Sequence, residues 1–535
     1  MWPQNYTPLA GSLGLSAFAA SAPILVLLLL LGVFRRPAWQ AALAGLGTAI
    51  AVAAFEYSMP VGRLAAAVTY GAAFGLFPIG WVVFGGILLY RISTEGGRFE
   101  ILKGSIGRLT QDRAIQTLLI AFAFGAFIEG AAGFGTPVAV AGAMMAGLGF
   151  EPFYAAAVCL LANTAPVAFG SIGIPVVTLA GVTGIPLERV SSAVGRICAP
   201  VSLFIPAYLI LVMFGRKGLR AAWAPAAVCG IVFASLQLAI SNLVAAQLTD
   251  IISSLAAMAA LVVYIRLTRD RTAPVEKTDH RSVLSAWMPY ILLVVFVLVW
   301  GIKPVQQQLN SVTIPIHWPA LDNTIQRLPP TVPKPAPYAA VYSMNWLSAS
   351  GTACLLASLS AALFIGMKPR RFAVAVGRNA RQLAMAELTL AAVLALAFLM
   401  NYSGATGTLG LAFAATGPCF PFFSALLGWV GVFLTGSDTS ANALFGPLQT
   451  VAAGRLGMNP ALMAAANSAG GVMGKMISLT SIAVAVCATS MRREDEARLF
   501  RFTLKHSVLL ATAIGLVVLF YAYVAPGWAP SVTPS

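Results

Sequence analysis

The sequence has few charged residues for its length. Only 9% of its 535 residues are Asp, Glu, Lys or Arg, whereas 59% are hydrophobic. A soluble protein of this size could not cover its surface with so few charges. Apolar runs of about 20 residues instead recur along the whole chain, as in proteins that cross a membrane many times. We therefore expect an all-α polytopic membrane protein embedded in a lipid bilayer.

Residues that build metal, haem and disulfide sites are also scarce. The six cysteines occur singly in apolar segments, and the three histidines each lie in or beside a predicted loop. The chain has no Cys-x-x-Cys pair and no HExxH or GxSxG motif. The sequence therefore predicts no metal site, no disulfide framework and no cofactor, and a membrane enzyme is the least expected class.

Acidic residues are half as frequent as basic ones, 17 against 33, and the net charge is +16. The basic residues cluster in short loops between apolar runs, for example at Arg35-Arg36 and Arg216-Lys217-Arg220. Such clusters mark the cytoplasmic ends of membrane spans and argue against nucleic-acid binding. No basic region precedes the first apolar run, so we expect a retained helix there. This pattern places both termini outside.

The apolar runs fall into two halves of opposite orientation. The first run of residues 1–220 must enter the cytoplasm, whereas the first run of residues 284–535 must leave it. We expect residues 221–283 to link the halves through two spans and a cytoplasmic loop, and the Pro-rich loop 303–341 to lie outside. Each half contains an interrupted region, and the expected spans and interrupted regions are 11–34, 40–58, 64–90, 114–189 (interrupted), 191–214, 222–248, 250–266, 284–302, 344–366, 382–400, 403–489 (interrupted) and 505–524.

Short sequence matches support a repeat. "LGFEP" from Leu148 matches "LGMNP" from Leu456, and "ANTAPVAFGS" from Ala162 matches "ANSAGGVMGK" from Ala466. "GTP" from Gly135 also matches "GPL" from Gly446 loosely. Inverted repeats with broken helices are typical of secondary transporters. We therefore expect about 12 or more transmembrane spans, arranged as two inverted-topology repeats with broken helices or re-entrant hairpins.

The stretch "GAFIEGAAGFGTPVAV", from Gly125 to Val140, places a carboxylate and helix-breaking residues in an apolar run. Non-helical backbone at membrane depth is tolerated only inside protein or beside a cavity. We expect one helix to stop near Glu129 and another to start with Thr136 as its N-cap and Pro137 as its first helical residue, with its N-terminus favouring an anion. Glycine-rich runs also serve close helix packing, which is the alternative for Gly133 and Gly135.

The second half carries "TGSDTSANALFGP", from Thr435 to Pro447, with Asp438 among many hydrogen-bonding side chains. Burying Glu129, Asp438 or Lys475 costs roughly 2.5–3.5 kcal/mol each on insertion scales, so we interpret these residues as functional. Ser and Thr in such helices also bond to their own backbone. The candidate substrate-binding residues are Gly133, Gly135, Thr136, Ser437, Thr439, Ser440, Asn442, Lys475, Asn163 and Asn467.

Lys475 distinguishes the two halves, because the matching position in the first half is Ser171. One cation suits a substrate with one negative group, although Lys475 could instead neutralise Asp438. Asn163 and Asn467 occupy matching positions in the two halves. The sequence supports two interpretations of them equally: their amides support the unwound backbone, or they bind the substrate.

The two signature stretches, "GAFIEGAAGFGTPVA" and "GSDTSANALFGPLQ", resemble those of the lactate permease family. The resemblance extends over nearly the whole chain. It implies a transporter of L-lactate, D-lactate and glycolate in the bacterial cytoplasmic (inner) membrane, usually coupled to a proton, with inverted repeats and re-entrant hairpins.

These observations lead to proton symport of a small 2-hydroxymonocarboxylate as the first hypothesis. The carboxylate would lie between the helix start at Thr136 and the polar segment around Ser437, with Lys475 as counter-charge. Either Glu129 or Asp438 would carry the proton, because burial disfavours a charged carboxylate. Sodium coupling through Asp438 and nearby oxygens is the transport alternative, and an anion channel is the alternative from another class.

Overall fold

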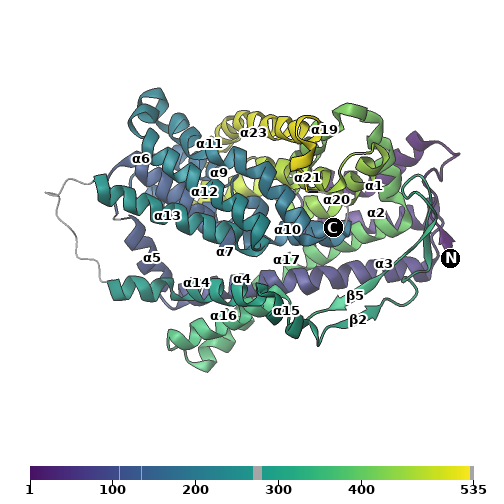
Figure 1. The fold of residues 1–535 in the computed structure, drawn as a ribbon, viewed down its shortest axis with the longest axis horizontal. Coiled ribbons are helices and arrows are strands. Elements are labelled where there is room, and N and C mark those ends of the chain that lie inside the picture. Colours follow the sequence, from purple (N-terminus) through teal and green to yellow (C-terminus); the bar gives the residue numbers. More distant parts are fainter. Residues whose placement is uncertain (108, 134, 269–279, 531–535) are drawn as a thin grey trace.

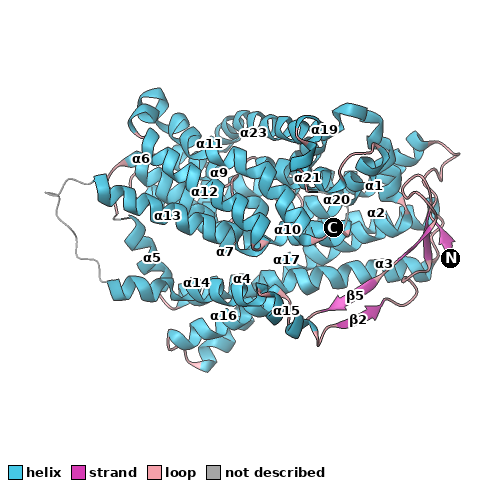
Figure 2. Ribbon diagram, viewed as in Figure 1, coloured by secondary structure: helices cyan, strands magenta, loops and turns pink. Residues whose placement is uncertain are grey.

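Helices make up nearly the whole molecule, with five short strands at one end (Figure 2). The computed structural model describes residues 1–107, 109–133, 135–268 and 280–530. Within these ranges, twelve helical segments are long and apolar enough to cross a membrane, or thirteen if the bent pair formed by residues 152–162 and 167–183 counts as one span. The expected polytopic all-α architecture is confirmed. Most of the polar linker expected at 267–283 lies outside the described residues.

Long helices and shorter, broken ones lie next to one another throughout the molecule (Figure 1). The span expected at 64–90 extends over residues 61–95 and is interrupted where Phe77 adopts an extended backbone. The longer helices and the short connecting helices are α1 (Leu13–Gly32), α2 (Ala38–Ala51), α3 (Val61–Phe74), α4 (Trp81–Glu95), α5 (Arg98–Gly107), α6 (Arg113–Gln116), α11 (Leu187–Ala221), α12 (Trp223–Leu243), α13 (Thr249–Thr268), α14 (His280–Gly301), α15 (Lys303–Asn310), α16 (Ser350–Phe364), α17 (Pro369–Ser403), α18 (Ala405–Phe413) and α23 (Glu496–Leu519).

The first interrupted region contains a re-entrant hairpin. Helix α7 (Gly125–Ala131) continues a π-helical segment, Thr117–Phe124, and α8 (Thr136–Gly147) turns back beside it. Nη1 of Arg113, where the segment begins, donates to the Leu148 carbonyl after α8 at 2.6 Å. Both open ends of the hairpin therefore lie on one side of the molecule, and the break falls between Ala131 and Thr136, close to the expected position.

A broken span follows this hairpin. Helix α9 (Pro152–Ala162) leads through a 3₁₀ turn at Val167–Phe169 into α10 (Gly170–Thr183), and the pair is bent by 63°. Three successive residues at the start of α10, Ser171, Ile172 and Gly173, have positive φ. The left-handed region is costly for a β-branched residue such as Ile172, so surrounding contacts must hold this turn.

The second interrupted region repeats the arrangement with opposite orientation. Helices α19 (Phe420–Thr435) and α20 (Asp438–Arg455) form its hairpin, and α21 (Pro460–Lys475) and α22 (Leu479–Ala488) form its broken span. Helix α10 packs against α20 and α22 packs against α8, which pairs each half-helix with one from the other repeat. The inverted repeat is confirmed. The loose match of Gly135 with Gly446 is wrong, because Gly135 caps α8 whereas Gly446 lies inside α20.

The two sides of the molecule differ in composition. On the side that we call the basic side, Nη1 of Arg378 lies 3.7 Å from Oε1 of Glu95. On the same side, the guanidinium carbon of Arg498 lies 4.3 Å from the Phe153 ring centroid. These contacts bring the end of α4 next to the first part of α17, and the beginning of α9 next to the beginning of α23. The basic loops that separate helices in the sequence thus meet in space.

The opposite side carries a small cap, residues 311–349 together with the N-terminal strand. Two sheets form it, β1 (Trp2–Pro3) with β3 (Ile325–Arg327) and β4 (Ala336–Tyr338), and β2 (Ile314–His317) with β5 (Val341–Met344). Gln4 Nε2 donates to the Asn401 and Tyr402 carbonyls at 2.8 and 2.9 Å, which attaches the cap to the end of α17. The Ala340 backbone N–H and the His317 ring hold the pKa of the Asp322 carboxyl below its usual value.

Helices α19 and α21 approach each other closely through glycines. A Cβ at Gly428 would collide with the Asn467 carbonyl, and one at Gly470 would collide with the Ala425 carbonyl. These neighbours are backbone atoms, which cannot move aside without shifting a helix. This contact is the close-packing role of small residues in membrane helices.

Gly428→Ala or Gly470→Ala should therefore lower the thermal unfolding temperature of the purified protein in detergent. Overpacking typically costs about 1–3 kcal/mol, and backbone collisions fall at the upper end. Gly454→Ala is the matched control, since a Cβ there meets nothing within 4 Å and alanine favours the helix. Equal unfolding temperatures for all three variants would contradict this account of the α19–α21 contact.

Candidate functional site

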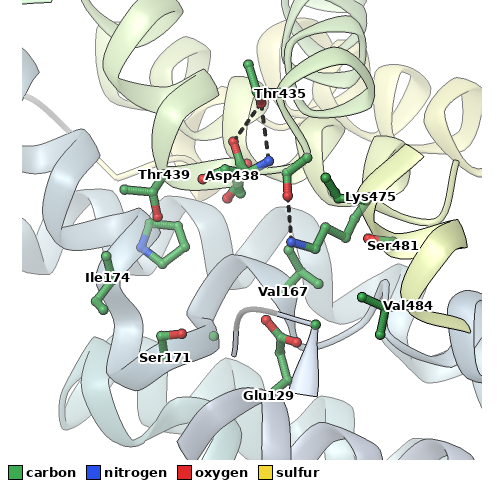
Figure 3. A pocket seen from close by; sticks show the side chains of 16 residues that line it. Glu129, Val167, Ser171, Ile174, Thr435, Asp438, Thr439, Lys475, Ser481 and Val484 are labelled. Carbon is green, nitrogen blue, oxygen red and sulfur yellow. Dashed lines mark hydrogen bonds between the residues drawn. The ribbon is translucent and has the colours of Figure 1, made fainter. Parts of the chain in front are cut away.

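A cavity of about 230 Å³ lies where the four half-helices meet (Figure 3). Its wall combines both interrupted regions, as the inverted repeat requires. The lining residues are Glu129, Gly135, Val167, Gly170, Ser171, Ile174, Pro175, Thr435, Gly436, Ser437, Asp438, Thr439, Lys475, Thr480, Ser481 and Val484.

The half-helices α8, α10, α20 and α22 all begin at this cavity. Gly135 caps α8 with φ of +81°, and Pro175 lies just after the left-handed turn in α10. The Ser437 and Ser478 side chains cap α20 and α22 by accepting from the Ser440 and Ser481 backbone N–H groups. A helix N-terminus carries about half a positive charge, so four of them converging on one cavity make it attractive to an anion.

Lys475, the last residue of α21, supplies a full positive charge to the cavity. Its Nζ donates to the Gly436 carbonyl at 2.6 Å, as Figure 3 shows. Among the described residues, no carboxylate lies within ion-pair distance of this ammonium group. Lys475 therefore does not pair directly with Asp438 here, and its charge is available to a ligand.

Asp438 begins α20 and faces both the cavity and helix α21. Its Oδ2 accepts from Ser468 Oγ at 2.6 Å and from Asn442 Nδ2 at 3.3 Å. Its Oδ1 is buried without a hydrogen-bond partner, in space left by the missing side chain of Gly471. Two donors thus stabilise one oxygen of this carboxyl group while the other stays unsatisfied.

Glu129, in the last turn of α7, is 4% exposed and points into the cavity from the other repeat (Figure 3). It packs on Gly170, where a Cβ would lie 2.5 Å from Glu129 Oε1. Oε2 is buried without a partner, and the Asn163 amide lies beside the carboxyl group. Glu129 and Asp438 are therefore separate acids on opposite walls, each with an unsatisfied oxygen.

A third buried acid, Asp250, was missed in the sequence. It lies in the first turn of α13 at 1% exposure, and both carboxyl oxygens are buried without a partner. A Cβ added to Gly130, the residue after Glu129, would lie 2.9 Å from the Asp250 Cβ. Asp250 and Glu129 are therefore close enough to interact electrostatically. The available signal was an acid at the start of an apolar span without a basic neighbour.

The expected substrate-binding residues divide into two groups. Gly135, Ser437, Thr439 and Lys475 line the cavity together with both candidate proton carriers. The others lie behind its wall: Gly133, Thr136, Asn163, Ser440, Asn442 and Asn467. Asn467 Nδ2 donates to Asn442 Oδ1 at 2.9 Å, and Gln449 donates to Asn467, so this amide network braces α20 against α21. Thr136 is the first helical residue of α8 and not its cap, because Gly135 takes that position.

Comparison with known proteins places these features in a family. Residues 16–525 match the family described as L-lactate permease. The chain is 41% identical to the L-lactate permeases of Escherichia coli K12 and Bacillus subtilis 168, covering 98% of this chain and 98% and 99% of those proteins. It is 39% identical to a glycolate permease of Escherichia coli K12, over 98% of this chain and 99% of that protein.

Two solved structures align less closely. Neisseria gonorrhoeae MtrF and the Alcanivorax borkumensis YdaH transporter each have a TM-score of 0.47, at 13% and 14% identity. The alignments cover 88% of this chain and 86% and 89% of the other two. The family match over residues 16–525 and the 41% identity to the L-lactate permeases show that the chain belongs to the L-lactate permease family of membrane transporters.

Proposed function

We propose that this protein imports L-lactate, D-lactate and glycolate across the bacterial cytoplasmic membrane by proton symport. The observation that carries the proposal is the cavity at which four helix N-termini and the free charge of Lys475 converge. Such a cavity favours one small anion. The relatives named for L-lactate and glycolate agree with that chemistry.

The orientation that we propose follows the charge distribution. The basic side, with Arg91, Arg113, Arg378 and Arg498, would face the cytoplasm, and the cap and both termini would lie outside. The α7–α8 hairpin would then enter from the cytoplasm and the α19–α20 hairpin from outside.

The substrate class follows from the charges and hydroxyl groups of the cavity. One unpaired ammonium group suits a monocarboxylate, because a second substrate carboxylate would face Glu129 or Asp438. The Ser437, Thr439 and Thr480 side chains line the same space and can hydrogen bond a substrate hydroxyl group. A 2-hydroxymonocarboxylate satisfies both requirements.

Proton coupling follows from the two acids in the wall. An ionised carboxylate beside an empty anion site repels the substrate, whereas its protonated form admits it. Substrate and proton would then cross together. The unsatisfied oxygens of Glu129 and Asp438 are the groups where that proton would reside.

Reconstituted vesicles provide the test. With a pH gradient, acidic outside, vesicles should accumulate labelled L-lactate, and a sodium gradient of equal size at uniform pH should not drive accumulation. Unlabelled glycolate should compete with uptake and succinate should not. Accumulation driven only by sodium would establish the alternative coupling, equilibration without accumulation would indicate a channel, and competition by succinate alone would indicate a dicarboxylate carrier.

A further inference from the structure

A second polar cavity, of about 100 Å³, lies between the cap and the helices. The cap contributes Arg327 and Tyr338, the N-terminal segment contributes Tyr6, and α17 contributes Asn401. The floor is formed by Thr183 at the end of α10 and Thr450 in α20, among other residues. The central site described above does not include any of these side chains.

Among the described residues that line this cavity, Arg327 is the single cation and none is a carboxylate. The guanidinium carbon lies 4.8 Å from the Tyr338 ring centroid, and Nε is buried without a hydrogen-bond partner. Among the described residues, no carboxylate lies within ion-pair distance of Arg327. A partly buried arginine without a counter-charge is costly, and a bound carboxylate would relieve that cost through paired N–H···O bonds.

Asn401 adds a second unsatisfied group to the same cavity. Its backbone carbonyl is bonded by Gln4, but its side-chain Oδ1 is buried without a donor. An amide oxygen accepts a hydrogen bond from a hydroxyl group. Arg327 and Asn401 thus offer a donor for a carboxylate and an acceptor for a hydroxyl group.

A wider cavity of about 710 Å³ adjoins this one and shares Gln4 and Tyr6 with it. Arg455 is the one charged side chain in its lining, and it is also positive. Positive charge along a concave path concentrates anions and accelerates their arrival. The wider cavity therefore leads an anion toward Arg327.

The same two helices form parts of both the Arg327 cavity and the central cavity. Pro175 of α10 and Thr439 of α20 line the central cavity, whereas Thr183 and Thr450 line the outer one. Thr183 follows Pro175 by eight residues of α-helix, which corresponds to a rise of about 12 Å along the helix axis. An anion bound at Arg327 is thus held a short distance from the central site. The C-terminal end of α10 carries a partial negative charge, which keeps the binding of this anion weak.

We propose that Arg327 and Asn401 form an outer capture site for the small 2-hydroxycarboxylate, occupied before the substrate reaches the central cavity. This inference rests on the proposed substrate and orientation. It assigns substrate contact on the cap side to residues outside both signature stretches.

Thiol labelling tests the site without requiring transport. Thr450→Cys places a thiol in the cavity, and it breaks no hydrogen bond between helices because Thr450 Oγ1 donates to the Pro447 carbonyl of its own helix. Cys419→Ser and Cys487→Ser remove the two exposed native thiols, while the other four are buried. L-lactate added outside should slow labelling of Thr450→Cys by N-ethylmaleimide.

Three added substitutions identify the cause of protection. Arg327→Gln should raise the L-lactate concentration that gives half protection by about tenfold or more, as expected for losing a charge-assisted hydrogen bond. Arg327→Lys, which keeps the charge, should give an intermediate value and serves if the Gln variant fails to fold. Lys334→Gln removes an exposed cap charge and should change nothing.

Lys475→Met separates the outer site from the central one. Protection should persist in this variant, because the outer cavity does not contain Lys475. Protection that survives Arg327→Gln, or that disappears with Lys475→Met, would overturn the proposal. Failure of the proposed function itself would appear separately, as absence of L-lactate uptake by the unmodified protein.

Discussion

Lys475→Met should nearly abolish uptake of L-lactate while leaving the protein folded. The ammonium group is the one full positive charge in the cavity lining, and methionine keeps the length of the side chain without its charge. Removing one partner of a desolvated charge pair costs about 2–5 kcal/mol, or roughly 30-fold to several-thousandfold in affinity. Initial uptake rates over a range of substrate concentrations measure the loss, which should be largest at low concentration.

Two further substitutions control this experiment. Lys475→Arg should retain part of the affinity, because it keeps the charge but changes the geometry of the bond to Gly436. Lys334→Met removes an exposed lysine of the cap, and this variant should transport L-lactate normally. Normal uptake by Lys475→Met would show that the helix N-termini alone bind the substrate and that Lys475 serves only to hold the Gly436 turn.

The sequence predicted the membrane class, the inverted halves and the broken regions because those depend on composition and on the order of residues. Glu129, Asp438 and Lys475 stood out for the same reason, since a charge in an apolar run is costly wherever its side chain points. The structure places all three around one cavity. The hypothesis of a site between the two interrupted regions anticipated this location. The pairing of α10 with α20 and of α8 with α22, which produces it, is not contained in any local pattern.

Rotation about a helix axis was harder to predict. Asp438 and Thr439 face the cavity, whereas Asn442 and Asn467 point into the contact between α20 and α21. Their polarity indicated a polar region but could not indicate which neighbour satisfies it. The left-handed turn at Ser171 to Gly173 was missed too, because tertiary contacts override the preferences of Ile172.

Asp250 shows a different limit. The sequence placed Asp250 at the start of the span 250–266, where an acid can reach water. In the structure, packing of α13 on the Gly130 backbone buries it completely. Only the small size of Gly130 permits that approach. Under the proposed proton coupling, a carboxyl group without a partner in such a place would be a second group able to hold a proton near Glu129.

Glu129→Gln should uncouple transport from the proton gradient. Glutamine keeps the shape of the side chain but cannot gain or lose a proton, so the anion site would no longer depend on protonation. Vesicles with this variant should exchange labelled for unlabelled L-lactate at uniform pH, yet a pH gradient should not drive accumulation. We expect the larger effect at Glu129, because Ser468 and Asn442 already donate to Asp438 and stabilise its ionised form.

Asp438→Asn and Glu151→Gln complete the comparison. Asp438→Asn should impair binding and accumulation together, because its amide would disturb the bonds from Ser468 and Asn442. Glu151→Gln, an exposed acid before α9, should behave like the unmodified protein. If Glu129→Gln and Asp438→Asn both kept full accumulation driven by a pH gradient, the proton would have to travel elsewhere. Asp250 would then be the next carboxyl group to replace, because both of its oxygens are unpartnered and it packs against Gly130, the residue after Glu129.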